Sequence, residues 1–444
     1  MTEPTWRNWA DSAHSNPHST QLPADVHDLT RLVTAAANTG LQVKCVGAGH
    51  SFSPIAVTDG VLVDLRRMSG IESVVPTATG AHVTVLAGTP LHQLNELLWA
   101  RGLSMQNLGD IDTQSVAGAI STGTHGTGSA FSGLAGLVVG LQVVLADGSV
   151  VDCSRDQGPD LFHAARLGLG AIGILSKIIL DCPHAFAMHA HEAPDTLDNV
   201  LRDLPHICET VDHFEFYWWP HTRRVLTKRN TRLPLDTPLK PVGKVTGYIS
   251  DEFLSNLVFE QTSRLCTRVP AIIPRMNWVA ARLLSEREYT DRSYRVFVSS
   301  RRVRFREMEY AIPVDALPGV LADLEKMIDT SGELVSFPVE VRFAAADDVW
   351  MSTANGRDSA YIAVHKYWRQ DYEAYFRAVE EIAVAAGGRP HWGKIHWRTA
   401  ADLREVYPHF DAFSAIREKH DPQHLFGNDY LAKVLDYRIP AEPV

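Results

Sequence analysis

A glycine-containing segment near the N-terminus has the residue types of an anion site. Its residues are Val46, Gly47, Ala48, Gly49, His50 and Ser51. Glycines let main-chain amides approach a diphosphate closely because no Cβ blocks the path. The third glycine of a Rossmann site would fall at Phe52, and no helix pattern starts there. GxG turns are common, so a structural turn with a structural histidine stays open as the alternative.

A second segment, residues 115–128, reads SVAGAISTGTHGTG. Few of these side chains can fill a core, but many can donate hydrogen bonds to an anion. A flexible loop is the alternative, although the stretch lacks the Pro, Lys and Glu that flexible linkers favour. We expect the two glycine-rich segments to form a cradle built from loops, without a helix terminus.

Charged residues near the C-terminus form a third candidate site. Glu340 and Arg342 are two apart in a strand-like run, so both point to one face, where they can hold a polyol and compensate negative charge. His391 and Lys394 follow in the motif HWGK. An ordinary cross-strand ion pair is the alternative for Glu340 and Arg342.

The run His189, His191 and Glu192 is a weaker candidate for a metal site. Alternation of this kind is common on exposed strands, and no third and fourth ligand follows at a recognisable spacing. We predict no metal.

Composition limits the classes of protein that remain. The chain has 444 residues, 45% of them apolar and 21% charged, as in packed proteins of two or three domains. Its net charge of -10 argues against nucleic acid as a main partner. The N-terminus has no signal-peptide pattern, and five scattered cysteines suggest no disulfide framework. These features predict a cytoplasmic protein without a transmembrane segment, and peripheral membrane association stays open.

Helices and strands are expected to alternate in the first 180 residues. A helical pattern starts after Asp25 and ends at Gly40, and another starts at Thr89 and Pro90 and ends at Gly102. Strand-like runs lie between and after them, which predicts an α+β fold. After Cys182 the composition changes to an aromatic, strand-rich pattern.

Several motifs in the same order resemble one family. GAGHSFSP, QNLGDID, SVAGAISTGTHGTG, EVR, HWGK and HLFGNDY are similar to motifs of the aldonolactone oxidoreductases in the vanillyl-alcohol oxidase superfamily. The similarity runs from about residue 6 to 436 and is greatest to actinobacterial L-gulono-1,4-lactone oxidases and dehydrogenases. DHFEFYWWP, MEYAIP and NGRDSAYIAVH strengthen it.

The resemblance implies three parts. An FAD-binding domain of the PCMH type, with two α+β subdomains, would span residues 1–184. A substrate-binding cap built on an antiparallel sheet would span residues 185–400. Residues 401–444 would return to the FAD-binding domain.

The same resemblance implies that FAD is the cofactor and that His50 is linked covalently to its C8 methyl group. An alkylated flavin has a raised potential, which eases hydride abstraction. The implied cofactor-binding residues beyond residues 46–51 are Gly109, Asp110, Ser115, Gly118, Thr122, Gly123, Thr124, His125, Gly170, Gly173 and Ile174.

The implied catalytic residues are Glu340, Arg342 and Lys394. Arg342 and Lys394 would stabilise negative charge that develops during hydride transfer, and Glu340 would accept hydrogen bonds from substrate hydroxyls. The other implied substrate-binding residues are Asp110, His365, Tyr367 and His391.

Two positions differ from the pattern of alditol oxidases, which have a small hydroxyl residue at Tyr367 and a serine at Asp110. Both differences favour a ring substrate over an open-chain polyol. Gly109 leaves space beside the flavin, which predicts that oxygen can reach it.

The leading hypothesis is oxidation of L-gulono-1,4-lactone at C2 to the 2-keto lactone, which tautomerises to L-ascorbate. Oxygen, a cytochrome or a quinone would reoxidise the flavin. The alternatives are an alditol oxidase, a metal-dependent hydrolase suggested by the histidine-rich run, and a flavin-binding protein without turnover. An FAD that is bound without the covalent link also stays open.

Overall fold

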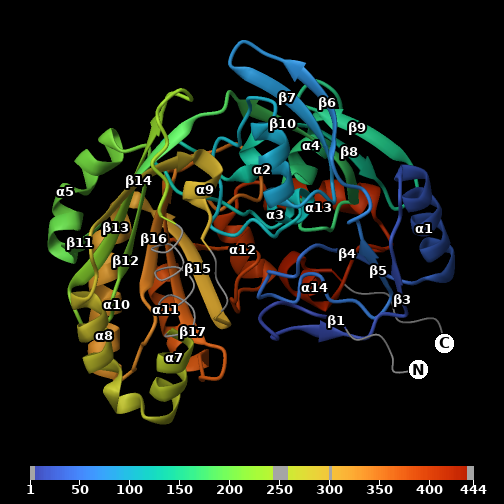
Figure 1. The fold of residues 1–444 in the computed structure, drawn as a ribbon. Helices are drawn as coiled ribbons and strands as arrows, with labels where there is room; N and C mark the ends of the chain where they lie inside the picture. The colour runs from blue at the N-terminus through green and yellow to red at the C-terminus, as the bar shows by residue number, and fades with distance from the viewer. Residues whose placement is uncertain (1–5, 244–258, 300–302, 438–444) are drawn as a thin grey trace.

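Two lobes of mixed helix and sheet face each other across the molecule (Figure 1). The structure is a computed structural model that describes residues 6–243, 259–299 and 303–437. The N-terminal lobe holds the strands up to β10, and the cap lobe holds β11 to β18. The expected α+β fold class, with a cap on an antiparallel sheet, is confirmed.

Two small sheets organise the N-terminal lobe. One is parallel with the order β3-β5-β4, and the other is antiparallel with the order β6-β7-β10-β8-β9. The elements of this lobe are β1 (Trp6–Arg7), β2 (His14–Ser15), β3 (Ser19–Gln21), α1 (Val26–Thr39), β4 (Val43–Val46), β5 (Val61–Asp64), β6 (Ile71–Pro76), β7 (Gly80–Leu86), α2 (Leu91–Trp99), α3 (Val116–Ser121), η1 (Leu134–Leu137), β8 (Val138–Val144), β9 (Val150–Ser154), α4 (Pro159–Arg166) and β10 (Ile174–Pro183).

The first helix shows how local sequence sets these boundaries. The Asp25 side chain accepts a hydrogen bond from the Asp28 amide and so caps α1. Leu29 and Val33 lie on its buried face. Gly40 ends the helix with φ at 68°, a left-handed conformation that glycine adopts without steric cost. The helix boundaries predicted from the sequence therefore match the structure.

One antiparallel sheet of eight strands forms the cap lobe, in the order β14-β11-β13-β12-β16-β17-β15-β18. The elements of this lobe are β11 (Ala187–Thr196), α5 (Leu197–Thr210), β12 (His213–Trp218), β13 (Arg224–Leu233), α7 (Phe259–Arg268), η3 (Pro270–Ile272), α8 (Ile273–Arg282), β14 (Arg287–Arg292), α9 (Ser293–Phe297), β15 (Phe305–Pro313), η4 (Val314–Ala316), α10 (Leu317–Ser331), β16 (Val339–Ala344), β17 (Ser359–Tyr367), α11 (Glu373–Ala385) and β18 (Arg389–Pro390).

Strands β15 and β16 of this sheet carry apolar side chains on one face and charged side chains on the other. Met308, Tyr310 and Val341 pack in an apolar core with residues of α10 and α11. Glu307 and Glu309 alternate with them along β15 and so point to the other face, toward the N-terminal lobe. The pleat therefore places charged side chains where the two lobes meet.

The C-terminal segment returns to the N-terminal lobe. Its helices are α12 (Ala400–Val406), α13 (Phe410–His420) and α14 (Asp429–Leu435). Leu403, Phe413 and Leu431 lie in the same apolar core as Leu29 and Val83 of the first sheets. The N-terminal lobe thus contains both ends of the described chain.

No helix among the described residues is long and apolar enough to cross a membrane.

The side chain of Asn428 ties the C-terminal segment to the first glycine-rich loop. It donates to the carbonyls of Pro54, Ile55 and Val57 at 2.9–3.1 Å, and its oxygen caps α14 at the Leu431 amide. We therefore expect Asn428→Ala to lower the free energy of unfolding by about 2–3 kcal/mol, measured by urea denaturation. Asn38→Ala, at an exposed position of α1, is the control, and equal stability of the two variants would contradict the assignment.

Candidate functional site

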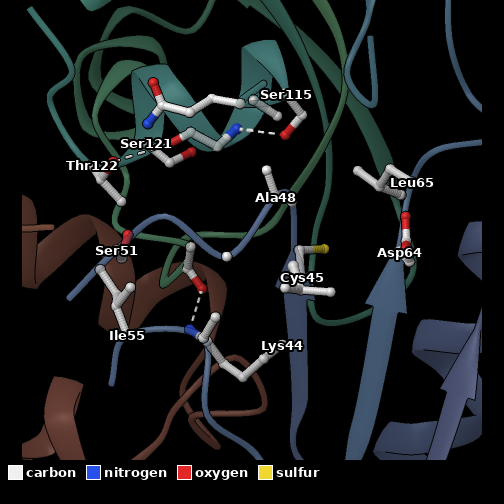
Figure 2. A pocket seen from close by; sticks show the side chains of 18 of the residues that line it. Lys44, Cys45, Ala48, Ser51, Ile55, Asp64, Leu65, Ser115, Ser121 and Thr122 are labelled. Atoms are coloured by element: carbon white, nitrogen blue, oxygen red, sulfur yellow. Dashed lines mark hydrogen bonds between the residues drawn. The ribbon is translucent and has the colours of Figure 1, made fainter. Parts of the chain in front are cut away.

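A cavity of about 280 Å³ opens where β4, β5 and the two glycine-rich segments meet (Figure 2). Most of the residues implied as cofactor-binding line it. They are Val46, Gly47, Ala48, Gly49, His50, Ser51, Ser115, Gly118, Thr122, Gly170, Gly173 and Ile174. The structure thus brings together segments that lie more than one hundred residues apart in the sequence.

Main-chain amides of the first glycine-rich loop are available to a ligand. Within the described part of the chain, the amides of Ala48, Gly49, His50 and Ser51 donate no hydrogen bond to protein atoms. Gly49 has φ at 70°, a left-handed conformation that glycine adopts without steric cost, and it lines the cavity. A Cβ on Gly47 would lie 2.7 Å from Ser115 Oγ, so the two loops approach too closely for a side chain. These features suit a diphosphate.

The second segment differs from the expected loop. Residues 116–121 form the short helix α3, whose N-cap Ser115 accepts a hydrogen bond from the Gly118 amide at 3.2 Å. Ala117, Gly118 and Ser121 of this helix line the cavity. The cradle therefore contains a helical turn, because alanine and isoleucine inside the glycine-rich stretch favour a helix once Ser115 caps it.

The residue implied as the flavin link, His50, lies at the junction of two cavities. Its ring stacks on Trp9 with centroids 5.2 Å apart, and its Nε2 lies 3.0 Å from Thr113 Oγ1. Burial, helped by the nearby Lys394 charge, lowers the pKa of His50 to about 4, so the ring is neutral near pH 7. His50, Ser51, Gln114 and Thr122 line both cavities.

The second cavity, of about 70 Å³, lies between the lobes. It is lined by residues of both: His50, Ser51, Phe52, Gly109, Asp110, Ile111, Gln114, Thr122, Thr124, His125, Phe305, Glu307, Glu309, Glu340, Arg342, His391, Gly393 and Lys394. All three residues implied as catalytic are among them.

Arg342 is the centre of a buried ion cluster in this cavity. Its guanidinium lies 2.5 Å from Glu340, 2.9 Å from Glu215 and 3.4 Å from Asp110. Burial acts to lower the pKa of Arg342, but Glu340 and Glu215 outweigh it and raise the pKa well above its usual value. Burial acts to raise the pKa of Glu215, and Arg342 and Lys228 bring it down to about 2. Arg342 is therefore a fixed cation, and its contacts go beyond a single cross-strand pair.

Lys394 is the second cation of the cavity. Its ammonium lies 2.5 Å from Glu307. Burial acts to lower the pKa of Lys394, but Glu307 and Glu309 raise it overall. Burial acts to raise the pKa of Glu307, and Lys394 and His365 lower it to about 2. Both members of the pair are charged near pH 7.

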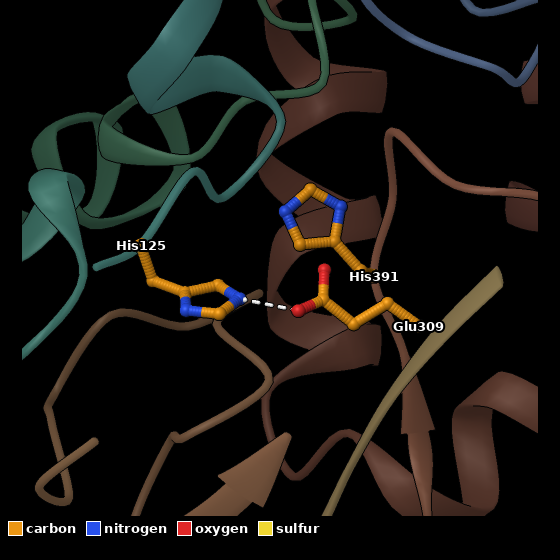
Figure 3. A group of neighbouring side chains, drawn as sticks. All are labelled: His125, Glu309 and His391. Carbon is orange, nitrogen blue, oxygen red and sulfur yellow. Dashed lines mark hydrogen bonds and ion pairs between the residues drawn. The ribbon is translucent and has the colours of Figure 1, made fainter. Parts of the chain in front are cut away.

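His125, Glu309 and His391 form a buried group in the wall of the same cavity (Figure 3). His125 Nε2 lies 3.1 Å from Glu309, and His125 Nδ1 lies 2.8 Å from the Gly126 carbonyl. Burial lowers the pKa of His391 to about 4, and its Nδ1 accepts the Gly393 amide. The neutral His391 ring, with Nδ1 as acceptor, carries its proton on Nε2.

The histidine-rich run of β11 pairs with neighbouring acids and bases. His189 lies 2.9 Å from Glu288, and His191 lies 2.7 Å from Glu286. Glu192 binds Arg287 at 2.9 Å. The three side chains that the hydrolase hypothesis required as metal ligands are therefore each paired with a charged side chain.

Two implied substrate residues and one implied cofactor residue lie outside the cavity linings. His365 lies behind Glu307, with its Nε2 3.5 Å from that carboxylate. The Tyr367 hydroxyl donates to Glu260 of α7 at 2.6 Å, and Tyr367 lines neither cavity. Gly123, with φ at 82°, packs against Leu167. His365 and Tyr367 pair across the sheet with Glu307 and Phe305 of β15, but neither lines the cavity.

Three carboxylates of the site were missed in the sequence: Glu215, Glu307 and Glu309. Glu215 stands in FEFYW, and the others stand in REMEY. The sequence did contain a signal for these three residues: each is an acid that alternates with aromatic or apolar residues along a strand-like run. Such an acid is buried when the strand is buried, and it then needs a cation nearby.

Gly109 lies in the second cavity against the other glycine-rich segment. A Cβ at this position would lie 3.1 Å from the His125 carbonyl and 3.5 Å from Thr124 Cγ2. The space that we expected beside Gly109 for oxygen is therefore narrow on the side of His125 and Thr124.

Comparisons with known proteins give the family. A family model described as D-arabinono-1,4-lactone oxidase matches residues 178–434, and one described as FAD binding domain matches residues 17–154. The chain is 40% identical to L-gulono-1,4-lactone dehydrogenase of Mycobacterium tuberculosis, over 97% of this chain and 99% of that protein. The chain belongs to the D-arabinono-1,4-lactone oxidase family and has an FAD-binding domain, which confirms the resemblance seen in its sequence.

Other relatives span the same length. L-gulonolactone oxidase of Mus musculus is 33% identical, over 97% of this chain and 98% of that protein. Alditol oxidase of a Streptomyces species is 31% identical, with the same coverage. The structure of cholesterol oxidase from Brevibacterium sterolicum has a TM-score of 0.79 at 17% identity, covering 97% of this chain and 96% of that one, and so shows the same fold.

The contact between Gly47 and Ser115 predicts the effect of a methyl group. Gly47→Ala should strain the cradle by about 1–3 kcal/mol and lower the flavin-to-protein absorbance ratio of the purified protein. Gly319→Ala is the matched control, because a Cβ there meets no atom within 4 Å. Equal flavin content in the two variants would show that the cavity does not hold the cofactor.

Proposed function

We propose that this protein oxidises the C2 alcohol of an aldono-1,4-lactone, with L-gulono-1,4-lactone as the leading substrate. The product would be the 2-keto lactone, which tautomerises to L-ascorbate. The observation that carries the proposal is a small charged cavity, lined by Glu340, Arg342 and Lys394, that shares His50 with the larger cavity. The names of the full-length relatives support the same chemistry.

FAD supplies the hydride acceptor in this reaction. The residues of the protein would bind and orient the substrate and compensate charge. Arg342 and Lys394 stay protonated near pH 7 and face the cavity, where they would compensate the negative charge that FAD would gain on accepting hydride from C2. Glu340 and Glu307 would accept hydrogen bonds from ring hydroxyls and so select which carbon reacts.

The charge of the cavity favours a neutral substrate. Its lining contains four carboxylates, from Asp110, Glu307, Glu309 and Glu340, and two cations, Arg342 and Lys394. A substrate carboxylate would meet this surplus of negative charge, whereas a lactone has its carboxyl group closed into the ring. A lactone is therefore preferred over the open-chain aldonic acid.

An alditol is the second candidate, because it is also neutral and because Tyr367 lies away from the cavity. Asp110, which pairs with Arg342, remains as the difference from alditol oxidases. Xylitol or sorbitol in place of the lactone distinguishes the two functions.

The deciding experiment is an anaerobic absorbance spectrum before and after addition of L-gulono-1,4-lactone. Bleaching of the flavin band supports the proposal, and a flavin that no aldonolactone bleaches overturns it. Rapid recovery in air would make oxygen the acceptor. Slow recovery that a cytochrome or quinone accelerates would make the protein a dehydrogenase. We further propose a cytoplasmic location.

The assigned role of Lys394 predicts a large kinetic effect. Lys394→Ala should lower the rate of anaerobic flavin reduction by roughly 10²-fold, because a cation is lost where charge develops. Lys326→Ala, at an exposed position of α10, is the control and should reduce at the wild-type rate. An unchanged rate in Lys394→Ala would contradict the role.

The position of His50 supports a covalent flavin, because the ring is neutral and lies between the two cavities. Flavin should therefore stay with wild-type protein after acid precipitation and should be released from His50→Ala. Retention of flavin in the His50→Ala pellet would show that the link lies elsewhere or that another residue replaces it.

A further inference from the structure

The ring of His50 is held by two side chains from different segments of the N-terminal lobe. It stacks on Trp9, with the ring centroids 5.2 Å apart and an angle of 24° between the planes. Its Nε2 lies 3.0 Å from the hydroxyl oxygen of Thr113. Among the described residues, Nδ1 has no hydrogen-bond partner. The two contacts therefore fix the plane of the ring and occupy one of its nitrogens.

The main chain on both sides of Thr113 is held without the help of its side chain. The amides of Leu91 and His92, at the start of α2, donate to the carbonyls of Gln114 and Asp112, both at 2.8 Å. Thr113 itself lines the larger cavity. A substitution that removes only its hydroxyl therefore leaves this stretch of backbone in place and changes the contact with the imidazole.

A hydroxyl group suits the ring before and after a bond forms on it. A neutral imidazole carries one N–H and one lone pair, and only the lone pair can form a new bond. Burial, with help from Lys394, lowers the pKa of His50 to about 4, so the ring is neutral near pH 7. With its proton on Nε2, the ring donates to the Thr113 oxygen and keeps the lone pair on Nδ1. Once Nδ1 is bonded, Nε2 has the lone pair and accepts from the hydroxyl.

We propose that Thr113 is a positioning residue for the flavin bond at His50, with its hydroxyl holding Nε2 and leaving Nδ1 to form the bond. This inference rests on the covalent link proposed above and is independent of the lactone activity. The new bond joins Nδ1 to the carbon of the C8 methyl group. One proton leaves that carbon and one leaves Nε2, and dioxygen takes the electron pair and both protons to become hydrogen peroxide.

The experiment compares wild type, Thr113→Val and Thr113→Ser, each purified with its flavin and incubated in air. The fraction of flavin that stays with acid-precipitated protein is measured at intervals. Thr113→Val has a similar shape but no hydroxyl. It should start with a lower linked fraction and gain linked flavin roughly fivefold more slowly than Thr113→Ser, which corresponds to one lost hydrogen bond. Thr113→Ser keeps the hydroxyl and should match wild type.

A second measurement identifies the linked nitrogen. The flavin peptide of wild type is isolated after proteolysis, and NMR should show the bond at Nδ1. Thr330→Val, at an exposed position of α10, is the control variant and should be linked as wild type is. The total flavin content should be the same in all variants, because the backbone contacts beside Thr113 are unchanged. This content reports an intact cavity separately from the link.

Three results would overturn the proposal, and they are distinguishable. Wild type that releases all its flavin on acid precipitation removes the covalent link itself. Wild-type flavin that is linked, together with Thr113→Val that is equally linked at purification, leaves the link standing and refutes only the role of Thr113. A wild-type bond at Nε2 also refutes that role, because this nitrogen is the one that the hydroxyl contacts.

Discussion

The guanidinium of Arg342 joins the two lobes through charge. It comes from the cap sheet, and its carboxylate partners come from both lobes: Glu215 and Glu340 from the cap, and Asp110 from the segment that follows α2. A buried carboxylate without a cation is strongly unfavourable, so Arg342 stabilises all three acids, and Lys228 also pairs with Glu215. This cluster forms part of the polar wall of the small cavity. The neighbouring ion pair of Glu307 and Lys394 forms another part.

The larger cavity, which we assign to the cofactor, is lined by a different kind of residue. Its lining includes Gly47, Gly49, Gly88, Gly118, Gly170 and Gly173, which expose main chain, whereas the smaller cavity has six charged side chains in its lining. A main-chain cradle is suited to a ligand that is always the same, since amides recognise phosphate without much discrimination among side groups. Charged side chains are suited to selecting one hydroxyl among several. His50 lies where the two kinds of wall meet, which is where cofactor and substrate chemistry must come together.

Much of the fold could be predicted from the sequence, because the signals were local. Asp25 and Gly40 bracket α1, and Asp147 and Gly148 mark the turn between β8 and β9. The spacing of Glu340 and Arg342 placed both on one face of a strand. Glu215, Glu307 and Glu309 could not be assigned in the same way, because their role depends on which strands are neighbours. The order β12-β16-β17-β15 brings together strands from four distant parts of the chain, and no local pattern specifies it. Tyr367 shows the same limit, since its partner Glu260 lies 107 positions away.

The buried ammonium of Lys44 has a consequence for how the protein matures. Burial lowers the pKa of Lys44 to about 7, and its Nζ donates to the carbonyls of Gly170 and Phe426 at the edge of the larger cavity. Phe426 also lines that cavity. The larger cavity is therefore complete only when the segment around Phe426 has packed against Lys44, and the N-terminal glycine-rich segments alone form an incomplete cradle.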